Sequence, residues 1–460
     1  MSETANIKRE IPDHWEWEKL PKVAEINPSF DSDKWSESEF EELEVSFIPM
    51  KAVSEISGEV DLDETKILGE AKGNYTYFEE NDVLFAKITP CMENGKACIA
   101  RDLKNDVGFG STEFHVLRTN GQVIEKFLFY FVIQEGYRRE AKRRMTGSAG
   151  QKRVPKEFME QTNIPVPPKP EQKQIVEKIE SLFSKLDAGV QDLETVETQL
   201  ERYRQSVLKS AVEGNLTKEW REEHKDELEP AEEFLDVLKK KRKQSNFKRK
   251  PKLESEFQDS VREIPKLWSW TKIGQIYYVK GGYAFKSKNY VKEGIPCIRI
   301  SNLQDGEVDL KEDCVFLEKS YLDKYPDYIV RKNDVLIAMS GATTGKLGVY
   351  KEGRKSLLNQ RVGNFIPYDD SLANKKFLFY FLQTIQKSIL DKAYGAAQPN
   401  ISATALSNFK IPLPPLEEQQ EIVNRIEKKL SVVKEARKII SQEQKRSSNL
   451  RQSILKEAFE

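Results

Sequence analysis

The hexapeptide Lys-Phe-Leu-Phe-Tyr-Phe occupies residues 126–131 and returns, letter for letter, at residues 376–381. Upstream, Asn-Asp-Val-Leu stands at residues 81–84 and again at residues 333–336. The copies are offset by 250 residues in the first pair (376 minus 126) and by 252 in the second (333 minus 81). Matches that keep their order at a nearly constant offset indicate internal repetition. The chain is therefore a tandem duplication of a unit of roughly 200 residues.

The repeat continues on both sides of these stretches. Each copy opens with Ile-Pro and a Trp three residues later, at residues 11–15 and 264–268, and ends at Ile-Pro-x-Pro-Pro, at residues 164–168 and 411–415. Between the matched stretches the two copies differ freely. A shared frame with divergent intervening sequence predicts two domains of one fold that recognise different targets.

Composition narrows the class of protein. Charged residues make up 32% of the 460 residues but nearly cancel to a net charge of −1, so net charge gives no evidence for an anionic partner. The four cysteines and three histidines have no metal-ligand spacing, which argues against structural zinc. No apolar stretch approaches the roughly 20 residues that span a bilayer, and no secretory signal opens the chain. We expect a soluble protein of a reducing cytoplasm.

Short β-branched and apolar runs, broken by Gly, Asn and Asp, predict strands in both copies, at residues 45–50, 82–88, 295–300 and 334–339. The duplicated aromatic hexapeptide leads into a helical pattern in each copy, and its rings are predicted to lie in the core. Each copy is therefore predicted to form a mixed α/β (α+β) domain.

A long helix of about 45 residues is predicted after each Pro-Pro stop, and at 1.5 Å per residue it measures about 65 Å. Its apolar residues recur at alternating steps of three and four, which predicts a coiled coil. The two helices most simply bury their seams against each other as an intramolecular antiparallel pair, and pairing with another molecule is the alternative. The predicted seam residues are Ile175, Ile179, Leu182, Leu186, Leu193, Leu200, Ile422, Ile426, Val433, Ile440, Leu450 and Ile454.

These features predict a first domain, a first long helix, a charged linker, a second domain and a second long helix. The linker is acidic from Glu219 to Asp236 and basic from Lys239 to Lys252. The basic run could contact phosphates, and a solvated, mobile linker is the other interpretation. The predicted boundaries of the five segments are 1–168, 169–213, 214–262, 263–415 and 416–460.

Catalytic patterns are not convincing in this chain. Residues 340–347 resemble a phosphate-binding loop, but the first Gly stands one residue too close and Leu347 follows the Lys where a Mg²⁺-binding hydroxyl is needed. Asn-Pro-Ser-Phe at residues 27–30 is similar to a loop of amino-methyltransferases, yet no Gly-rich methyl-donor loop precedes it, so a turn after a strand is predicted. The histidines form no nucleophile arrangement. We predict a chain that catalyses nothing itself.

Binding chemistry is better represented. Residues 137–156 hold eight Lys or Arg interleaved with Gly, Ser and Gln, which suits phosphate contact from a helix end and base contact from a loop. The same place in the second copy, residues 387–400, is less basic but carries amide side chains that can read adenine. Polar loops follow the Asn-Asp-Val-Leu strand in both copies, at residues 87–96 and 340–346. Further donors lie in residues 281–286 and 299–302.

The chain resembles the specificity subunits of type I restriction-modification enzymes. The resemblance rests on the Asn-Asp-Val-Leu strands, the Ser-Gly-Ala-Thr-Thr-Gly-Lys loop at 340–346, the helix entry at 411–423, the Arg-Gln-Ser-Ile-Leu-Lys exit at 451–456 and the segment 213–221. It covers nearly the whole chain, because the order of domain, Pro-rich stop and long helix, given twice, is the architecture of the family.

The resemblance implies a DNA-binding subunit without catalytic activity, in a complex that methylates adenine and cleaves DNA. Each domain is expected to read one half of an asymmetric bipartite site on double-stranded DNA, and the coiled coil to set the spacer and dock the partners. The expected partners are two methylation subunits and, through the complex, the restriction or motor subunits. S-adenosylmethionine, ATP and Mg²⁺ are expected on these partners and no cofactor or metal on this chain.

The resemblance also selects candidate DNA-contacting residues from the polar clusters. In the first domain they are Lys87, Lys96, Arg138, Arg143, Ser148, Gln151, Lys152 and Arg153. In the second domain they are Gly282, Tyr283, Arg299, Asn302, Ser340, Thr343, Thr344, Lys346, Gln360, Arg361, Tyr394, Gln398 and Asn400.

Three other functions fit parts of the pattern. A specificity subunit of a bifunctional type II system would have the same sequence features. A non-catalytic coiled-coil scaffold would not need two diverged domains with matched polar loops. A fused restriction enzyme with its own methyltransferase or nuclease would need catalytic loops that the sequence does not offer.

Overall fold

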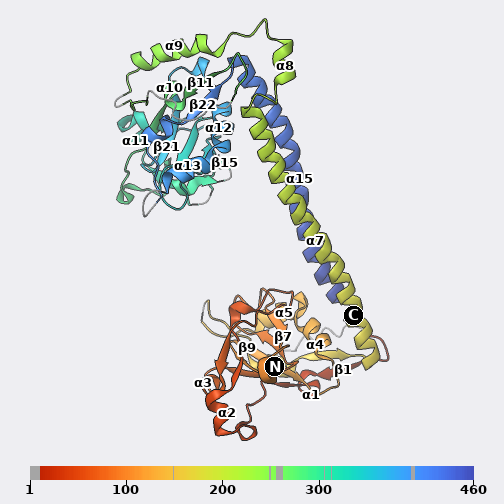
Figure 1. Ribbon diagram of the computed structural model, residues 1–460. Coiled ribbons are helices and arrows are strands. Elements are labelled where there is room, and N and C mark those ends of the chain that lie inside the picture. The colour runs from red at the N-terminus through yellow and green to blue at the C-terminus, as the bar shows by residue number, and fades with distance from the viewer. Residues whose placement is uncertain are drawn as a thin grey trace. The chain divides into compact units, whose positions relative to one another are not determined.

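The computed structural model describes residues 11–460 apart from residues 149, 248–249, 255–262, 305, 312 and 395–398. The chain divides into two compact units (Figure 1). Unit 1 comprises Met1–Thr195 and Ile439–Glu460, and unit 2 comprises Val196–Lys438. Each unit thus contains one predicted domain together with a part of each long helix.

Unit 1 is built on two four-stranded sheets and a two-stranded ladder. The first sheet has the order β2 (Ala24–Ile26), β9 (Phe114–Thr119), β6 (Val83–Ala86), β7 (Ala97–Ile99), and the second β4 (Thr65–Ile67), β3 (Glu44–Ile48), β8 (Val107–Gly110), β5 (Thr76–Glu79). The ladder pairs β1 (Glu16–Lys19) with β10 (Asn163–Val166). The short helices are α1 (Leu20–Val23), α2 (Glu37–Glu42), α3 (Leu68–Ala71), α4 (Glu125–Val132), α5 (Glu135–Arg144) and α6 (Lys156–Gln161), with 3-10 turns η1 (Ser32–Lys34), η2 (Met50–Ala52) and η3 (Lys104–Asp106).

Unit 2 repeats this plan with more strands. Its six-stranded sheet has the order β12 (Tyr277–Gly281), β21 (Val362–Pro367), β18 (Val335–Ala338), β19 (Leu347–Val349), β15 (Gly306–Val308), β14 (Leu303–Gln304). Its four-stranded sheet has the order β16 (Val315–Leu317), β13 (Ile295–Ile298), β20 (Ser356–Leu358), β17 (Ile329–Val330). A two-stranded ladder pairs β11 (Ser269–Lys272) with β22 (Lys410–Leu413). Its short helices are α8 (Lys218–Glu223), α9 (Ala231–Gln244), α10 (Ile273–Ile276), α11 (Tyr321–Lys324), α12 (Lys375–Thr384), α13 (Gln386–Ala393) and α14 (Ala403–Ser407), with η4 (Ser287–Asn289), η5 (Ile300–Asn302), η6 (Pro326–Tyr328) and η7 (Asp370–Leu372).

The duplication is visible in the backbone of each unit. Asn81 and Asn333 both adopt φ of 68°, a left-handed turn that asparagine tolerates, just before the strands β6 and β18. The amide of Asn81 donates to Ala100 O at 2.7 Å, and that of Asn333 donates to Tyr350 O at 2.7 Å. The prediction of two mixed α/β domains of one fold is confirmed.

The duplicated hexapeptide forms core helices, as predicted. Phe127 in α4 is fully buried and Phe131 is 8% exposed, while Phe377 in α12 is 2% exposed. In unit 1 the Phe127 ring also packs on Phe459, near the chain end, with ring centroids 4.8 Å apart. These aromatic side chains stabilise the domains by burial and are not available to stack on bases.

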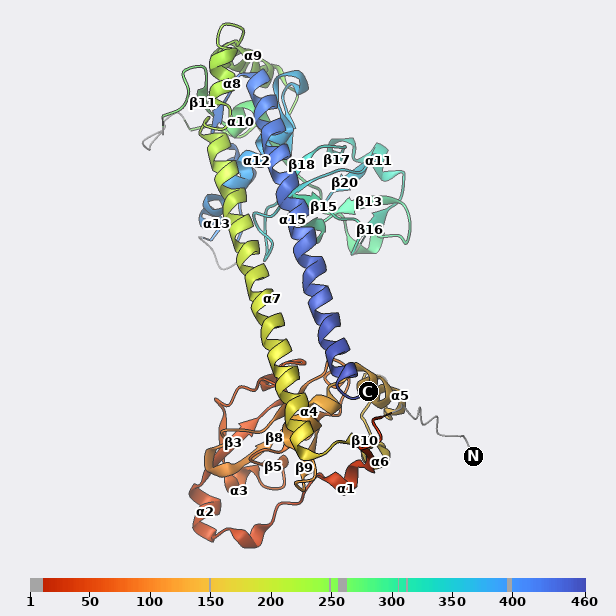
Figure 2. The same cartoon turned by 90° about the vertical axis from the view of Figure 1, so that its right-hand side faces the viewer.

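The long helices are α7 (Lys169–Val212) and α15 (Leu416–Glu457), and they run side by side (Figure 1 and Figure 2). In unit 1 Arg451 forms an ion pair with Asp187. In unit 2 Arg437 lies 2.6 Å from Glu201, while the core further along α7 joins Leu208 to Ile422. Residue numbers therefore rise along one helix as they fall along the other, and the predicted antiparallel pairing is confirmed.

The seam is buried less evenly than its heptad pattern predicts. Two paired helices cover only one face of each other, and Ile179, Ile422 and Ile426 are also covered by a domain core. Ile179, Ile422, Ile426, Val433 and Ile440 are buried, whereas Ile175, Leu182, Leu186, Leu193, Leu200 and Ile454 are partly buried.

The prediction for Leu450 was wrong, because its side chain is 47% exposed. The guanidinium of Arg451 lies over the Phe183 ring instead, 4.8 Å from its centroid. Leu455 is fully buried beside Ile454 because this end of α15 also faces the core of unit 1, which turns the buried face of the helix.

The described part of the linker contains the helices α8 and α9, which differs from the interpretation of the whole segment as a mobile linker, although Lys239, Lys240 and Lys243 are exposed to solvent. Phe234, Leu235 and Leu238 of α9 belong to the core of unit 2. The Lys241 ammonium lies 3.0 Å from the Asp369 carboxylate of the same unit. The sequence pattern of α9 is amphipathic, and tertiary packing of its apolar face holds the basic run on the domain.

Candidate nucleic-acid interface

Two polar loops that are far apart in sequence meet at the end of β6 in unit 1. The amide of Val154 donates to Lys87 O at 2.8 Å, and Ile88 pairs with Arg153 in an antiparallel bridge. The loop of residues 145–154 is thereby fixed beside the loop that follows β6. The structure brings together the two clusters that the sequence identified separately.

Unit 2 contains the same arrangement at the end of β18. The amide of Ile401 donates to Met339 O at 2.8 Å, and Ser340 pairs with Asn400 in an antiparallel bridge. The shared backbone pattern makes Met339 the counterpart of Lys87 and Asn400 the counterpart of Arg153. The frame is conserved between the two units while the side chains it presents differ in charge.

The loop in unit 1 presents polar side chains to solvent. Ser148, Gln151 and Lys152 are exposed. Arg153 makes a two-pronged contact with Glu113, with its Nη2 2.7 Å and its Nε 2.9 Å from the carboxylate oxygens. This hydrogen-bonded pairing lowers the pKa of Glu113. A guanidinium held by a carboxylate on its flank stays oriented at the surface.

The other basic candidates of unit 1, which are Lys87, Lys96 and Arg143, differ in how far they contact the domain. Burial lowers the pKa of the half-buried Lys87. The ammonium of Lys96 donates to Met50 O at 3.1 Å, and Arg143 lies 2.5 Å from Glu140 on its own helix. The first two side chains are therefore partly engaged by the domain, whereas Arg143 is exposed.

The prediction that Arg138 contacts DNA is corrected. Its side chain is 7% exposed, and its Nε donates to Ile133 O at 3.0 Å while Nη1 donates to Glu93 O. A guanidinium satisfied by backbone carbonyls inside the domain holds the loop of Glu93 against α5 and does not reach a ligand.

Two candidates in unit 2 are likewise structural. Asn302 is fully buried, where its Oδ1 accepts from Arg299 N at 2.9 Å. Thr344 is 5% exposed, and its hydroxyl donates to Gly341 O at 2.6 Å. Both side chains form turns next to the polar loops, and their predicted DNA contacts are corrected on that ground.

Arg299, Gly282 and Tyr283 shape the same region of unit 2. Arg299 donates to Asp313, with 2.9 Å between nitrogen and carboxylate oxygen. A Cβ on Gly282 would lie 2.1 Å from Asn359 O, so the close approach of these two backbone segments requires glycine. Tyr283 is 37% exposed and packs on Tyr325 with ring centroids 4.5 Å apart.

The other candidates of unit 2 lie at the surface of these loops. Tyr394 is 65% exposed. Gln398 lies outside the described residues. Lys346, Gln360, Arg361 and Asn400 are exposed, and Ser340 and Thr343 are partly exposed.

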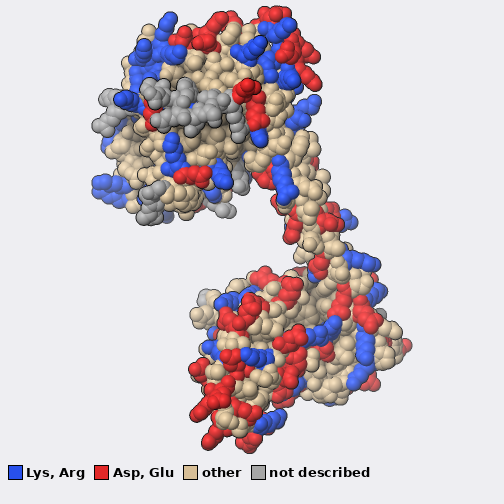
Figure 3. Space-filling view, viewed as in Figure 1, with Lys and Arg blue, Asp and Glu red and all other residues tan. Residues whose placement is uncertain are grey.

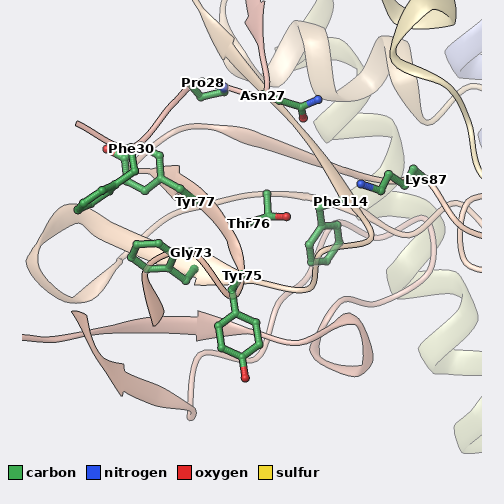
Figure 4. Close-up of a pocket in the computed structure, with 10 residues that line it drawn as sticks. Asn27, Pro28, Phe30, Gly73, Tyr75, Thr76, Tyr77, Lys87 and Phe114 are labelled. Atoms are coloured by element: carbon green, nitrogen blue, oxygen red, sulfur yellow. The ribbon is translucent and has the colours of Figure 1, made fainter. Parts of the chain in front are cut away.

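A cavity of about 320 Å³ lies beside Lys87 in unit 1, and the sequence did not predict it (Figure 4). Asn27 stands at its rim in a left-handed turn with φ of 56°, right after β2. The Asn27 Oδ1 accepts from Val116 N at 2.9 Å and its Nδ2 contacts the His115 ring at 3.2 Å. The predicted turn after a strand is confirmed for Asn-Pro-Ser-Phe, and the Asn27 side chain is committed to the fold.

Charge is unevenly spread over unit 1. Acidic residues are dense between residues 31 and 64, and red side chains gather over α2 in the space-filling view (Figure 3). This acidic region would repel phosphates, whereas Lys152 and Arg153 lie outside it, on the loop of residues 145–154. Within the described ranges, no cluster of metal-ligating side chains and no helix apolar and long enough to cross a membrane occurs.

The chain is similar to known proteins over most of its length. A model described as "Type I restriction modification DNA specificity domain" matches residues 12–198 and 265–442. The EcoAI specificity subunit of Escherichia coli is 31% identical, covering 94% of this chain and 80% of the relative. The MjaVIII specificity subunit of Methanocaldococcus jannaschii is 30% identical, covering 69% of this chain and 66% of the relative.

Two solved structures share the fold at 20% identity. One, from work on "complex assembly" and "conformational transition of the type I R-M system", has a TM-score of 0.70 and covers 98% of this chain and 99% of that chain. The other, the HsdS subunit from Thermoanaerobacter tengcongensis, has a TM-score of 0.54 and covers 99% of each chain.

Proposed function

The chain belongs to the family of type I restriction-modification DNA specificity subunits, and on that basis we propose that each of its units reads one half of an asymmetric bipartite site. One observation carries this proposal. The same loop arrangement, fixed by Val154 on Lys87 in one unit and by Ile401 on Met339 in the other, presents different side chains in each. Equal frames with unequal side chains suit two half-sites of different sequence.

The paired helices are proposed to set the spacer between the half-sites. In an antiparallel pair, a direct repeat in sequence becomes an approximate two-fold axis in space, which matches the symmetry of a DNA duplex. The length of α7 and α15, 44 and 42 residues, then determines how far apart the two half-sites lie.

The chain is proposed to act without catalysis of its own. Each histidine side chain is engaged in the fold: His115 Nε2 contacts Val154 O at 2.8 Å, His224 Nδ1 contacts Trp220 O at 2.8 Å, and His14 contacts Glu171 at 2.8 Å. Burial also lowers the pKa of His115. S-adenosylmethionine, ATP and Mg²⁺ are assigned to partner subunits, and none of them to this chain.

Two methylation subunits are proposed to dock on the long helices, and the motor subunits to join through them. Besides the seam, α7 exposes Val196 (41%) and Tyr203 (44%), seven residues apart, and α15 exposes Val432 (67%) and Ile439 (51%), also seven apart. Apolar side chains at heptad spacing outside the seam suit helices of a partner.

A domain duplication tests the assignment of half-sites. Residues 12–168 are replaced by residues 265–415, which joins equivalent Ile-Pro and Pro-Pro positions, and the modified motif is mapped in cells that supply the methylation subunit. The proposal predicts a symmetric bipartite motif built from the second half-site twice. An asymmetric motif like that of the parent chain would contradict it, and the reverse duplication serves as the matched control.

A further inference from the structure

The cavity of unit 1 lies at one end of its two four-stranded sheets. The loop after β6 and the loop of residues 145–154 lie at the same end. The cavity is lined by the turn after β2, by the start of β5 and by the end of β6. Lys87 belongs both to its wall and, through its carbonyl bond to Val154, to the proposed DNA-reading loop. A ligand in this cavity would therefore touch the same surface as bound DNA.

One wall of the cavity is aromatic. Phe30 packs on Tyr77 with ring centroids 5.0 Å apart and on Phe109 at 5.6 Å. Tyr77 and Phe109 are 9% and 1% exposed, so the rings are fixed by the core. Phe30 itself is only partly buried, so its ring, held in place by these buried neighbours, can pack against a flat, unsaturated ligand.

The opposite side carries hydrogen-bonding groups. The ammonium of Lys87 and the hydroxyl of Thr76 point toward each other across the space (Figure 4). Burial lowers the pKa of Lys87, which means that its charge is incompletely solvated and gains from an acceptor. An ammonium donates to the ring nitrogen and carbonyl acceptors at a base edge.

We propose that this cavity receives one unstacked nucleobase from the first half-site, packed against Phe30 and hydrogen-bonded by Lys87 and Thr76. A volume of about 320 Å³ is at the lower end of the range for small-ligand pockets. Side chains that read a stacked base pair protrude into a groove, whereas a hollow can take only a group that leaves the duplex. The proposal rests on the proposed function, because it requires that unit 1 binds DNA.

The second unit is not expected to do the same. Met339 stands at the position of Lys87, fixed by the Ile401 amide as Lys87 is fixed by Val154. A thioether cannot donate a hydrogen bond to a base edge. The substitution Lys87→Met therefore converts the first unit to the side chain that the fold already accepts at the equivalent place.

The test uses the complex of the full chain with its methylation subunits and duplexes that carry the recognised motif. A mismatch is introduced at one base pair at a time through the first half-site, and Kd is measured for each duplex. Because a mismatched base costs less to unstack, one position should bind roughly five-fold tighter than the intact duplex. Lys87→Met and the cavity-filling Thr76→Phe should abolish that gain, while Lys34→Met, at an exposed site on the acidic surface, should keep it.

The adenine that the methylation subunit modifies provides an internal reference. A mismatch there can strengthen binding through the partner subunit, and this gain should persist in all variants. The proposal is overturned if a mismatch at no other position tightens binding, or if the tighter binding survives both Lys87→Met and Thr76→Phe. A wild-type complex that binds no bipartite motif would instead refute the proposed function.

Discussion

The guanidinium of Arg221 donates to the Glu418 carboxylate at 2.6 Å inside unit 2, although 197 residues separate them in sequence. Glu418 is fully buried and also accepts from the Thr217 hydroxyl at 2.7 Å and from Trp268 Nε1 at 2.8 Å. Three segments thus converge on one carboxylate: the segment after α7, the start of the second domain and the first turn of α15. The contact gives Thr217 and Arg221, four residues apart in the segment 213–221, a shared structural role.

Removing Arg221 should destabilise unit 2. Arg221→Ala leaves the buried Glu418 charge without its cationic partner, which typically costs about 3–5 kcal/mol. Denaturant unfolding of the full chain would measure the loss. Lys218→Ala, at an exposed position of the same helix α8, should change stability by less than about 0.5 kcal/mol. Equal stability of the two variants would show that the buried pair does not hold these segments together.

Replacing Lys152 and Arg153 by alanine should weaken DNA binding by the assembled complex. Because each phosphate contact releases a counterion, the slope of log K against log salt should fall in magnitude by about one to two. Arg138→Ala is the matched control, since its side chain is buried and should affect stability and not the slope. A slope that is unchanged in the double variant would place residues 152 and 153 away from the DNA backbone.

The Asp369 carboxylate should make the stability of unit 2 depend on pH. Hydrogen bonds from Ser371 and Lys241 lower its pKa from 3.8 to about 2. A carboxylate with a depressed pKa in the folded state contributes stability that is present above pH 4 and lost as the pH falls toward 2. Ser371→Ala should therefore be less stable than the parent near neutral pH, and the difference should shrink below pH 4.

Thermal unfolding of the parent and of Ser371→Ala between pH 2 and pH 6 measures this difference. Lys240→Ala, which removes an exposed neighbour of Lys241, is the control and should leave the pH profile as it is. A stability difference that stays constant over the whole pH range would refute the role given to Asp369.

Lengthening both long helices should change the spacer between the half-sites. One heptad inserted into α7 and one into α15 at facing positions adds about 10 Å, or about three base pairs. The preferred spacer in the methylated motif should grow accordingly while both half-sites keep their sequence. Retention of the original spacer by a variant that still methylates DNA would contradict the proposal that the helices act as a ruler.

The sequence predicted the features that repeat. The KFLFYF core helices, the Asn-Asp-Val-Leu strands and the antiparallel long helices follow from patterns that depend on local periodicity. The sequence did not predict which polar side chains are buried, because burial depends on tertiary partners. Arg138 resembles its exposed neighbours in sequence, yet the carbonyls of Ile133 and Glu93 enclose it.

The same limit explains the linker and the cavity. The acidic and basic runs of residues 219–252 suggested solvent exposure, but a stripe of Phe234, Leu235 and Leu238 was enough to dock α9 on the domain. The cavity is lined by residues from five separate segments, at positions 27–30, 73–77, 87, 109 and 114, so that no contiguous pattern marks it. Of its lining residues, the sequence selected only Lys87 as a DNA contact, through its place after the duplicated strand, and it predicted a turn at residues 27–30.

The most direct test of the central claim is to map adenine methylation in DNA from cells that express this chain with and without a methylation subunit. The account predicts one asymmetric bipartite motif that is methylated only when both chains are present. Methylation by this chain alone would reveal a catalytic site, and absence of a motif with its partner subunits present would contradict DNA recognition by this chain.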